Sequence, residues 1–240
     1  LFVNNLNREA ATIQSERELW GDVMASGVDG VLYINDEITE EHLEILSEVS
    51  VDVVLTNTVC KEPSFPSVAI DYKKAAYDIT KEMINRGNKK IWMITTIRKY
   101  MVNDLKVEGY QKAMEEAGLQ SYVLQVSGKT ELNEPAYEEA LKNDHPDVAI
   151  VVRDSMAVSF INVARLQHIH IPNEMQVIGF QNTRYSELSR PKLTCINTPI
   201  YEIGEKSMDL LTKLMEQTLE EGEDLHENIP YEVIWRDSTK

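Results

Sequence analysis

Cysteine is scarce in this sequence of 240 residues, with Cys60 and Cys195 the only two and no CxxC spacing between them. This argues against a disulfide framework and against a cysteine-based zinc site, and unpaired thiols are typical of a reducing compartment. No run approaches the ~18 apolar residues of a membrane span. The first residues also lack the basic stretch and apolar core of a secretion signal. We therefore expect a soluble, cytoplasmic protein.

Positive charge is also in short supply. Lysine and arginine number 24 against 40 acidic residues, which gives a formal net charge of -16. No basic run is visible, and an acidic chain repels phosphate backbones unless its cations are gathered in one place. The composition, 42% hydrophobic and 27% charged, is that of a globular protein. We expect no nucleic-acid binding by this chain alone.

Motifs of the common enzyme classes are missing. The sequence has no GxSxG elbow, no P-loop, no GxGxxG after a strand and no HExxH. His168 and His170 offer two imidazoles to a metal, but no third ligand lies near them in sequence, so we interpret them as surface-loop histidines. We therefore expect that the protein is not an enzyme and that it binds neither a metal ion nor a cofactor.

Short apolar runs alternate with amphipathic stretches, which is typical of α/β folds with a mostly parallel sheet. The expected strands are Gly30–Ile34, Val51–Thr56, Val68–Ile70, Lys90–Thr95, Tyr122–Val126, Val148–Val152 and Met175–Phe180. The expected helices are Ser15–Ser26, Thr39–Glu48, Lys73–Arg86, Leu105–Ala117, Glu134–Asn143, Ser155–Gln167 and Tyr201–Glu221.

A series of short motifs resembles the effector-binding core of the LacI/GalR family of bacterial transcription regulators. Each is weak alone, but they follow the family's order over nearly the whole chain. They are Val28–Val31, Lys106–Tyr110, Arg153–Ala157, Ile171–Pro172, Val177–Thr183 and Arg190–Thr194. The tail resembles the catabolite-control members of the family most, at Tyr201–Gly204, Leu210–Met215 and Arg236–Lys240.

The resemblance implies the periplasmic-binding-protein type I architecture, with two Rossmann-like lobes, three crossovers and a ligand cleft between the lobes. The N-lobe is expected over residues 1–70 plus 198–221, and the C-lobe over 71–197 plus 222–240. Leu1–Asn4 resembles the family's second strand, so the first strand and helix are not in this sequence. Nothing resembles the family's DNA-binding headpiece either, so we expect the chain to be a fragment of a longer regulator.

The resemblance also assigns the ligand-binding positions. The family's sugar-binding arginine falls on Lys106, its Asn-Asp pair on Arg153 and Asp154, its sugar-binding aspartate on Gln181, and a polar crossover residue on Thr198. One carboxylate is thus replaced by an amide and one cation is gained. Two interpretations stay open: a degenerate pocket, or a changed ligand that is more anionic than a free sugar, such as a sugar phosphate.

A second set of positions concerns a protein partner. In catabolite-control members, the helix that begins near Tyr201 helps to bind a serine-phosphorylated phosphocarrier protein, HPr. Their phosphate-pairing arginine falls on Asp209 here, whereas Lys213 keeps a basic position and Lys206 adds one. A carboxylate repels a phosphate, so Asp209 argues for a lost or remodelled partnership. The alternative is that Asp209 is simply a solvated helix residue.

The expected function is the effector-sensing and dimerising core of a LacI/GalR-type regulator, a repressor that reaches operator DNA through a headpiece. The alternative is a secreted or periplasmic solute-binding receptor of the same fold, and a sugar-processing enzyme ranks third. The residues that precede Leu1 in the full-length protein would separate regulator from receptor.

Overall fold

The computed structural model describes residues 13–34, 38, 40–59, 65–98, 100–142 and 144–240, and these form two compact units. Unit 1 comprises residues 1–69 and 200–228, and unit 2 comprises residues 70–199 and 229–240, so the chain crosses between them three times. This confirms the predicted α/β architecture with two mostly parallel sheets. The strand expected at Leu1–Asn4 and the thiol of Cys60 lie outside the described residues.

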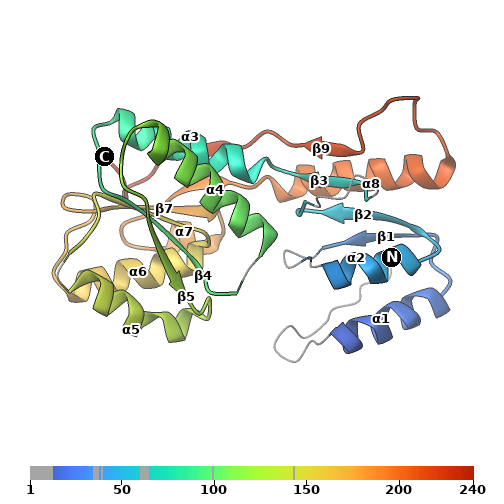
Figure 1. The fold of residues 1–240 in the computed structure, drawn as a ribbon, viewed down its shortest axis with the longest axis horizontal. Helices are drawn as coiled ribbons and strands as arrows, with labels where there is room; N and C mark the ends of the chain where they lie inside the picture. Colours follow the sequence, from blue (N-terminus) through green and yellow to red (C-terminus); the bar gives the residue numbers. More distant parts are fainter. Residues whose placement is uncertain (1–12, 35–37, 39, 60–64, 99, 143) are drawn as a thin grey trace. The chain divides into compact units, whose positions relative to one another are not determined.

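Unit 1 contains a sheet of four parallel strands in the order β1-β2-β3-β9 (Figure 1). The strands are β1 (Gly30–Tyr33), β2 (Asp52–Thr56), β3 (Ser67–Ala69) and β9 (His226–Asn228). The sequence-based division places residues 222–240 wholly in the C-lobe, whereas β9 pairs with β3 in this first sheet. A polar strand of three residues has no apolar pattern, which is why the sequence did not indicate it.

Three helices cover this sheet: α1 (Ile13–Ala25), α2 (Glu40–Glu48) and α8 (Ile200–Glu216). Alternate residues of a strand point to opposite faces. Accordingly Val53 and Leu55 of β2 pack in one cluster with Trp20 of α1 and Ile45 of α2. Helix α8 contacts β1, β2 and β3. A Cβ on Gly30 would lie 2.8 Å from Sδ of Met215 and 2.9 Å from Cδ1 of Leu211, so the absence of a side chain lets α8 pack closely against β1.

Unit 2 contains a six-stranded sheet in the order β10-β8-β7-β6-β4-β5, parallel except for β10. The strands are β4 (Ile91–Thr96), β5 (Tyr122–Val126), β6 (Val148–Val151), β7 (Gln176–Gln181), β8 (Thr194–Asn197) and β10 (Glu232–Ile234). Strands β4 and β6 are buried along their whole length. Continuous apolar strands of this kind are typical of a parallel sheet covered on both faces.

Two helix pairs form the layers of unit 2, and Figure 1 shows the sheet between them. The helices are α3 (Tyr72–Asn85), α4 (Met101–Glu116), α5 (Thr130–Leu141) and α6 (Asp154–Leu166), with a short α7 (Arg184–Leu188). Helices α3 and α4 cross so closely that a Cβ on Gly109 would lie 2.0 Å from the carbonyl oxygen of Lys73. In the other layer, the rings of Tyr137 and Phe160 meet edge to face with centroids 5.1 Å apart.

Three helix bounds differ from the sequence pattern by four residues or more. Helix α4 begins at Met101, one turn before the predicted Leu105, because the first turn buries Val102 and Asn103. Helix α5 begins at Thr130 and includes Pro135, which the pattern placed in a first turn from Glu134. Helix α8 ends at Glu216 rather than Glu221, since Gln217 takes a positive φ of 54° that stops the helix.

The C-terminal residues are integral to unit 2. Strand β10 pairs with β8, and the hydroxyl of Ser238 donates to the carbonyl oxygen of Val177 at 2.6 Å. The guanidinium of Arg86 lies 3.8 Å from the centre of the Trp235 ring and donates to the carbonyl oxygen of Lys240 at 2.9 Å. Among the residues described, no helix is long and apolar enough to cross a membrane.

Candidate functional site

The carboxyl end of the second sheet has the topology of a ligand site. Strand β4 lies between β5 and β6, and the chain runs from β4 to β5 on one side before it returns to β6 on the other. The loops that leave β4 and β6 therefore diverge at this edge. Crevices of this kind are where open parallel α/β sheets bind ligands.

Arg153 lies at this switch point. It lies two residues after the end of β6 and is the residue before the first turn of α6, in an extended conformation with φ of -142°. Its half-buried guanidinium lies 5.0 Å from the centre of the Tyr100 ring, which comes from the loop after β4. Arg98 lies 5.8 Å from the same ring. Two guanidinium groups thus share one aromatic ring at the carboxyl end of the sheet.

Lys106 approaches the same edge from α4 but is buried. Its side chain is 3% exposed, and its Nζ lies 3.3 Å from the carbonyl oxygen of Val152 and 3.4 Å from Oδ1 of Asn103. The ammonium also lies 5.0 Å from the Tyr72 ring and 4.7 Å from the Phe180 ring. Cation–π contacts of this kind stabilise a desolvated charge by about 2 kcal/mol. Lys106 is therefore a buried cation beneath the sheet edge.

Gln181 ends β7 in an unusual backbone conformation. Its φ is 106° and that of Asn182 is 58°, so two successive residues other than glycine occupy the region that favours glycine. Such residues cost on the order of 1–3 kcal/mol each and persist only where the surroundings hold them. The side chain of Gln181 is exposed.

Asp154 forms hydrogen bonds within unit 2. Its carboxylate is fully buried and accepts hydrogen bonds from the backbone N–H and hydroxyl of Thr183, at 2.6 and 2.9 Å, and from the thiol of Cys195 at 3.4 Å. Burial raises the pKa of Asp154, although these hydrogen bonds favour its ionised form. A Cβ on Gly179 would lie 2.5 Å from this carboxylate, so glycine makes room for it. The resemblance assigned Asp154 to the ligand site, and in the structure its carboxylate also holds the turn after β7.

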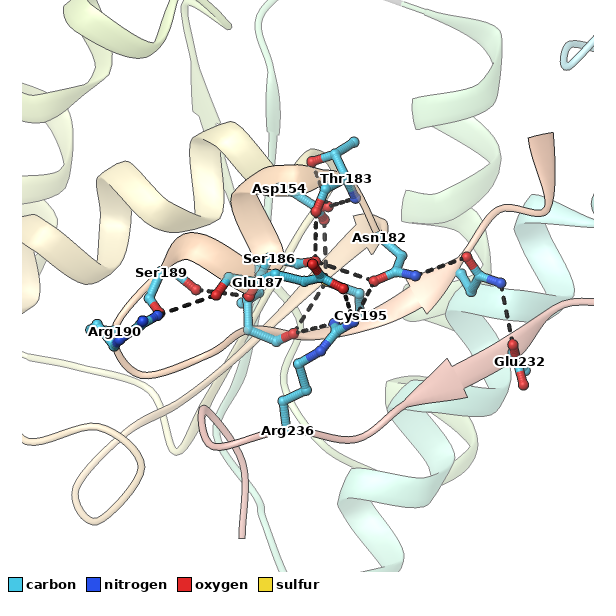
Figure 2. A network of polar contacts seen from close by, with 12 residues as sticks. Asp154, Asn182, Thr183, Ser186, Glu187, Ser189, Arg190, Cys195, Glu232 and Arg236 are labelled. Atoms are coloured by element: carbon cyan, nitrogen blue, oxygen red, sulfur yellow. Dashed lines mark hydrogen bonds and ion pairs between the residues drawn. The ribbon is translucent and has the colours of Figure 1, made fainter. Parts of the chain in front are cut away.

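Asn182 is held from three directions (Figure 2). Its Nδ2 donates to Asn197 Oδ1 at 3.1 Å, and its Oδ1 accepts from Ser186 at 3.2 Å and from Nη2 of Arg236 at 2.7 Å. These partners come from β8, from α7 and from the chain after β10. The turn after β7 is therefore fixed by side chains from separate parts of unit 2.

Thr198 follows β8 and is 5% exposed. Its hydroxyl has no hydrogen-bond partner within the described part of the chain. Buried polar groups are almost always paired, so an exception needs an explanation. Thr198, Gln181 and Arg153 each stand at the carboxyl end of a strand in unit 2, whereas Lys106 reaches that end from α4.

The three predicted partner positions lie on α8 of unit 1. Tyr201 is 91% exposed, and Asp209 is exposed as well. Lys213 pairs with Glu223, which follows the helix. Asp209 and Lys213 are four residues apart and so lie on one side of the helix. These side chains are available at the surface of unit 1.

His168 and His170, the two imidazoles that the sequence offered as a metal pair, both lie at the surface of unit 2. Among the described residues, no group of three or more histidine, cysteine, aspartate or glutamate side chains is arranged to hold a metal ion. His170 pairs with Glu174, which follows four residues later in a turn, and His168 is exposed with a φ of 61°. Both therefore have ordinary surface explanations.

The sequence motifs assigned no ligand-site role to Tyr72, Tyr100, Asn103 or Phe180, although all four lie next to Lys106 or Arg153. Aromatic residues at strand and helix ends look like core residues in a sequence. Arg236 was noted only as part of the tail that resembles the family. Its side chain reaches Asn182 across 54 positions of sequence, which no local pattern indicates.

Comparison with known proteins decides the family. Residues 80–239 match the periplasmic binding protein-like domain family. Catabolite control protein A of Priestia megaterium is 34% identical over 230 residues, which cover 94% of this chain and 69% of that protein. The chain belongs to the LacI/GalR family of transcription regulators. This confirms the predicted relationship, and this LacI/GalR chain is the core of such a regulator.

Solved structures agree with this assignment. The transcription regulator CcpA of Lactococcus lactis superposes with a TM-score of 0.84 at 30% identity, over 95% of this chain and 84% of that one. The complex of the regulator CelR with cellobiose gives a TM-score of 0.83 at 22% identity, over 95% and 71% of the two chains, and supports the fold alone. These relatives of the LacI/GalR chain are regulators, which disfavours the solute-receptor alternative.

Proposed function

We propose that this chain is the effector-sensing and dimerising core of a transcriptional repressor whose effector is a small anionic metabolite of the sugar-phosphate type. The observation that carries the proposal is the gathering of Arg153, Gln181 and Thr198 at the carboxyl ends of three strands of unit 2, with Lys106 beneath them. The comparisons establish a regulator core, and the effector class and the repressor role are our proposal.

Charge supports an anion over a neutral sugar. Arg153 is half-buried at the switch point with Arg98 on the same aromatic ring, and Lys106 adds a third cation behind them. Gln181 stands where the resemblance places a carboxylate in sugar-binding members. Charge-assisted hydrogen bonds contribute roughly 1.5–3 kcal/mol against ~1 for neutral ones. A phosphate or carboxylate on the ligand forms charge-assisted bonds in which both partners are ionised, whereas a sugar hydroxyl accepts from these cations as a neutral group.

The proposed regulation is a population shift. An effector that binds one arrangement of the two units more tightly than another shifts the equilibrium by that difference in affinity and no more. Operator DNA is contacted through a headpiece outside this chain, because the core has a net charge of -16 and repels phosphates by itself. The repressor acts in the cytoplasm in this proposal, and it has no catalytic role or cofactor.

A homodimer is part of the proposal. Leu166, Tyr185 and Leu188 are 74%, 56% and 74% exposed, and they lie on α6 and α7, which contact each other. Nη1 of Arg165 donates to the carbonyl oxygen of Arg190 at 3.4 Å, which holds the ends of these helices together. Large apolar side chains grouped on a surface mark association sites. A second copy of the chain is the occupant that we propose.

We propose that the binding of an HPr-type phosphorylated coregulator is lost or remodelled in this protein. Asp209 is exposed on α8, and Lys213 is engaged with Glu223. A phosphate that approaches this side of α8 meets a carboxylate where an arginine would form charge-assisted bonds. Surface plasmon resonance with serine-phosphorylated HPr should therefore show no binding, and Asp209→Arg should create or strengthen it.

Calorimetric titration of the purified dimer with glucose and glucose 6-phosphate tests the effector class. The phosphorylated sugar should bind about tenfold or more tightly, which corresponds to a difference of roughly 1.4 kcal/mol. Arg153→Thr should remove that preference, and Gln181→Asp should lower the affinity for the phosphorylated sugar through like-charge repulsion. Lys192→Thr is the control, since Lys192 is an exposed cation that precedes β8. Equal affinity for the two sugars would contradict an anionic effector and favour a degenerate pocket.

A further inference from the structure

The turn after β7 combines backbone strain with a dense set of side-chain bonds. Gln181 and Asn182 have φ angles of 106° and 58°, and Thr183 then begins α7 as its cap. Unless something holds it, a turn of this kind relaxes toward conformations with negative φ. The bonds to Asn182 and Thr183 therefore decide where the Gln181 side chain lies.

Arg236 supplies the charged bond in this set. Its side chain is 14% exposed and comes from the segment that follows β10. Nη2 donates to Asn182 Oδ1 at 2.7 Å, while Nη1 donates to the carbonyl oxygen of Leu193 at 2.9 Å. One guanidinium thus joins the turn after β7 to the segment that enters β8.

The backbone of Arg236 is fixed as firmly as its side chain. Its N–H donates to the hydroxyl of Thr194 at 2.8 Å, and its carbonyl oxygen accepts from the same hydroxyl at 3.1 Å. The guanidinium therefore extends from an anchored base. A planar fork reaches two acceptors in different directions, which a lysine ammonium on the same stem does less well.

The charge of Arg236 also acts on Asp154, the second residue that holds the turn. Asp154, which accepts from Thr183, is fully buried, and Arg236 favours its ionised form. A carboxylate and a guanidinium thus hold adjacent residues of one turn, Thr183 and Asn182. In Figure 2, Asp154 and Arg236 lie on opposite sides of the network that contains the turn.

We infer that Arg236 is a positioning residue for effector binding: its bond to Asn182 keeps the Gln181–Thr183 turn in its left-handed conformation and so places Gln181 at the ligand site. The inference rests on the proposed function, because Gln181 matters only if a ligand binds at this edge of the sheet. Arg236 itself touches no ligand in this account and acts through Asn182.

Arg86 offers a matched control. It is a second arginine that grips the same C-terminal segment, with Nη1 on the carbonyl oxygen of Lys240 at 2.9 Å and its guanidinium over the Trp235 ring. Within the described part of the chain, its side-chain partners are Glu82, Trp235 and Lys240, none of which belongs to the turn. Arg86→Met therefore removes an arginine-to-carbonyl bond and a cation–π contact at the tail while the turn keeps its partners.

The experiment compares Arg236→Met, Arg236→Lys, Asn182→Ala and Arg86→Met in the full-length regulator. Amide hydrogen exchange of the peptide that covers Gln181–Thr183 is measured without ligand, and the dissociation constant for glucose 6-phosphate is measured by calorimetry. Urea unfolding of each variant reports its stability separately. A double variant, Arg236→Met with Asn182→Ala, tests whether the two residues act together.

In Arg236→Met, exchange at the turn should accelerate about tenfold or more and the dissociation constant should rise about tenfold, as expected for loss of a charge-assisted bond. Arg236→Lys should restore part of both. The double variant should be no worse than the worse single variant. Arg86→Met should lower stability yet leave exchange and affinity within about twofold of the parent protein.

Three results would overturn the inference: equal exchange in Arg236→Met and Arg86→Met, losses of affinity that follow stability alone, or additive effects in the double variant. If the parent protein binds neither glucose nor glucose 6-phosphate, the anionic-effector proposal fails. The exchange comparison then still decides whether Arg236 holds the turn.

Discussion

The carboxylate of Asp154 accepts hydrogen bonds from both the backbone N–H and the hydroxyl of Thr183, at 2.6 and 2.9 Å. This places the first residue of α6 against the cap of α7. Asp154→Ala should lower the free energy of unfolding by about 3 kcal/mol, because it removes charged hydrogen bonds and leaves a donor without its acceptor. Urea unfolding measures the change.

Asp144→Ala is the control for that substitution. Asp144 is an exposed carboxylate that pairs with Lys90, and exposed ion pairs contribute little to stability. If both variants unfold at the same urea concentration, the contacts of Asp154 do not stabilise unit 2.

Unit 1 should lose stability in acid through Glu16. Burial opposes ionisation of this carboxylate, but bonds from His42, at 2.8 Å, and from Tyr33 outweigh it and hold the pKa of Glu16 below its ordinary value of 4.5. A lowered pKa adds stability above the unfolded value, and that stability is lost as pH falls through the folded value.

Unfolding free energies measured from pH 6 down to pH 3 should therefore fall less steeply below about pH 4.5 in Glu16→Gln than in the parent protein. Glu44→Gln, on the exposed face of α2, should keep the parent slope. Parallel curves for all three proteins would contradict the role given to Glu16.

Gly109 and Gly204 should respond in opposite ways to alanine. A Cβ at Gly109 meets the backbone of Lys73 at 2.0 Å, whereas nothing lies within 4 Å of one at Gly204 of α8. Gly109→Ala should cost about 3 kcal/mol because α3 and α4 must separate. Gly204→Ala should add about 0.5–1 kcal/mol through helix propensity. Melting temperatures that move in the same direction would refute this account of the helix crossing.

The apolar surface of α6 and α7 should determine the oligomeric state. Leu188→Glu replaces an exposed leucine of α7 by a charge and should shift sedimentation at micromolar concentration from dimer toward monomer. Leu132→Glu, at a 59% exposed leucine on α5, should leave the dimer unchanged. A Leu188→Glu variant that stays dimeric would place the interface elsewhere.

Sequence patterns predicted the long apolar elements well. Strands such as β4 and β6 are buried throughout, so their sequences are continuous apolar runs. They missed β8 (Thr194–Asn197), although it is an interior strand of the sheet, because Thr194 and Asn197 break a short apolar run. They also missed α7, whose five residues show no helical period.

The candidate site was accessible only through the resemblance, which supplied positions rather than environments. It placed Lys106 among ligand contacts, whereas its burial between Tyr72 and Phe180 depends on packing that no spacing reveals. Asp154 shows the same limit, since its partners, Thr183 before α7 and Cys195 of β8, meet it only in the folded chain. The identity of a motif residue does not specify whether its side chain contacts a ligand or bonds to other parts of the protein.

The pairing of β10 with β8 has a consequence for biosynthesis. A ribosome releases β8 well before Glu232–Ile234 emerge, so for that interval the nascent sheet carries an open strand edge. Open edges of this kind are templates for pairing with other chains. Messages truncated shortly before the codon for Glu232 should therefore yield aggregates rather than a smaller soluble core, and translation speed over the last codons should influence yield.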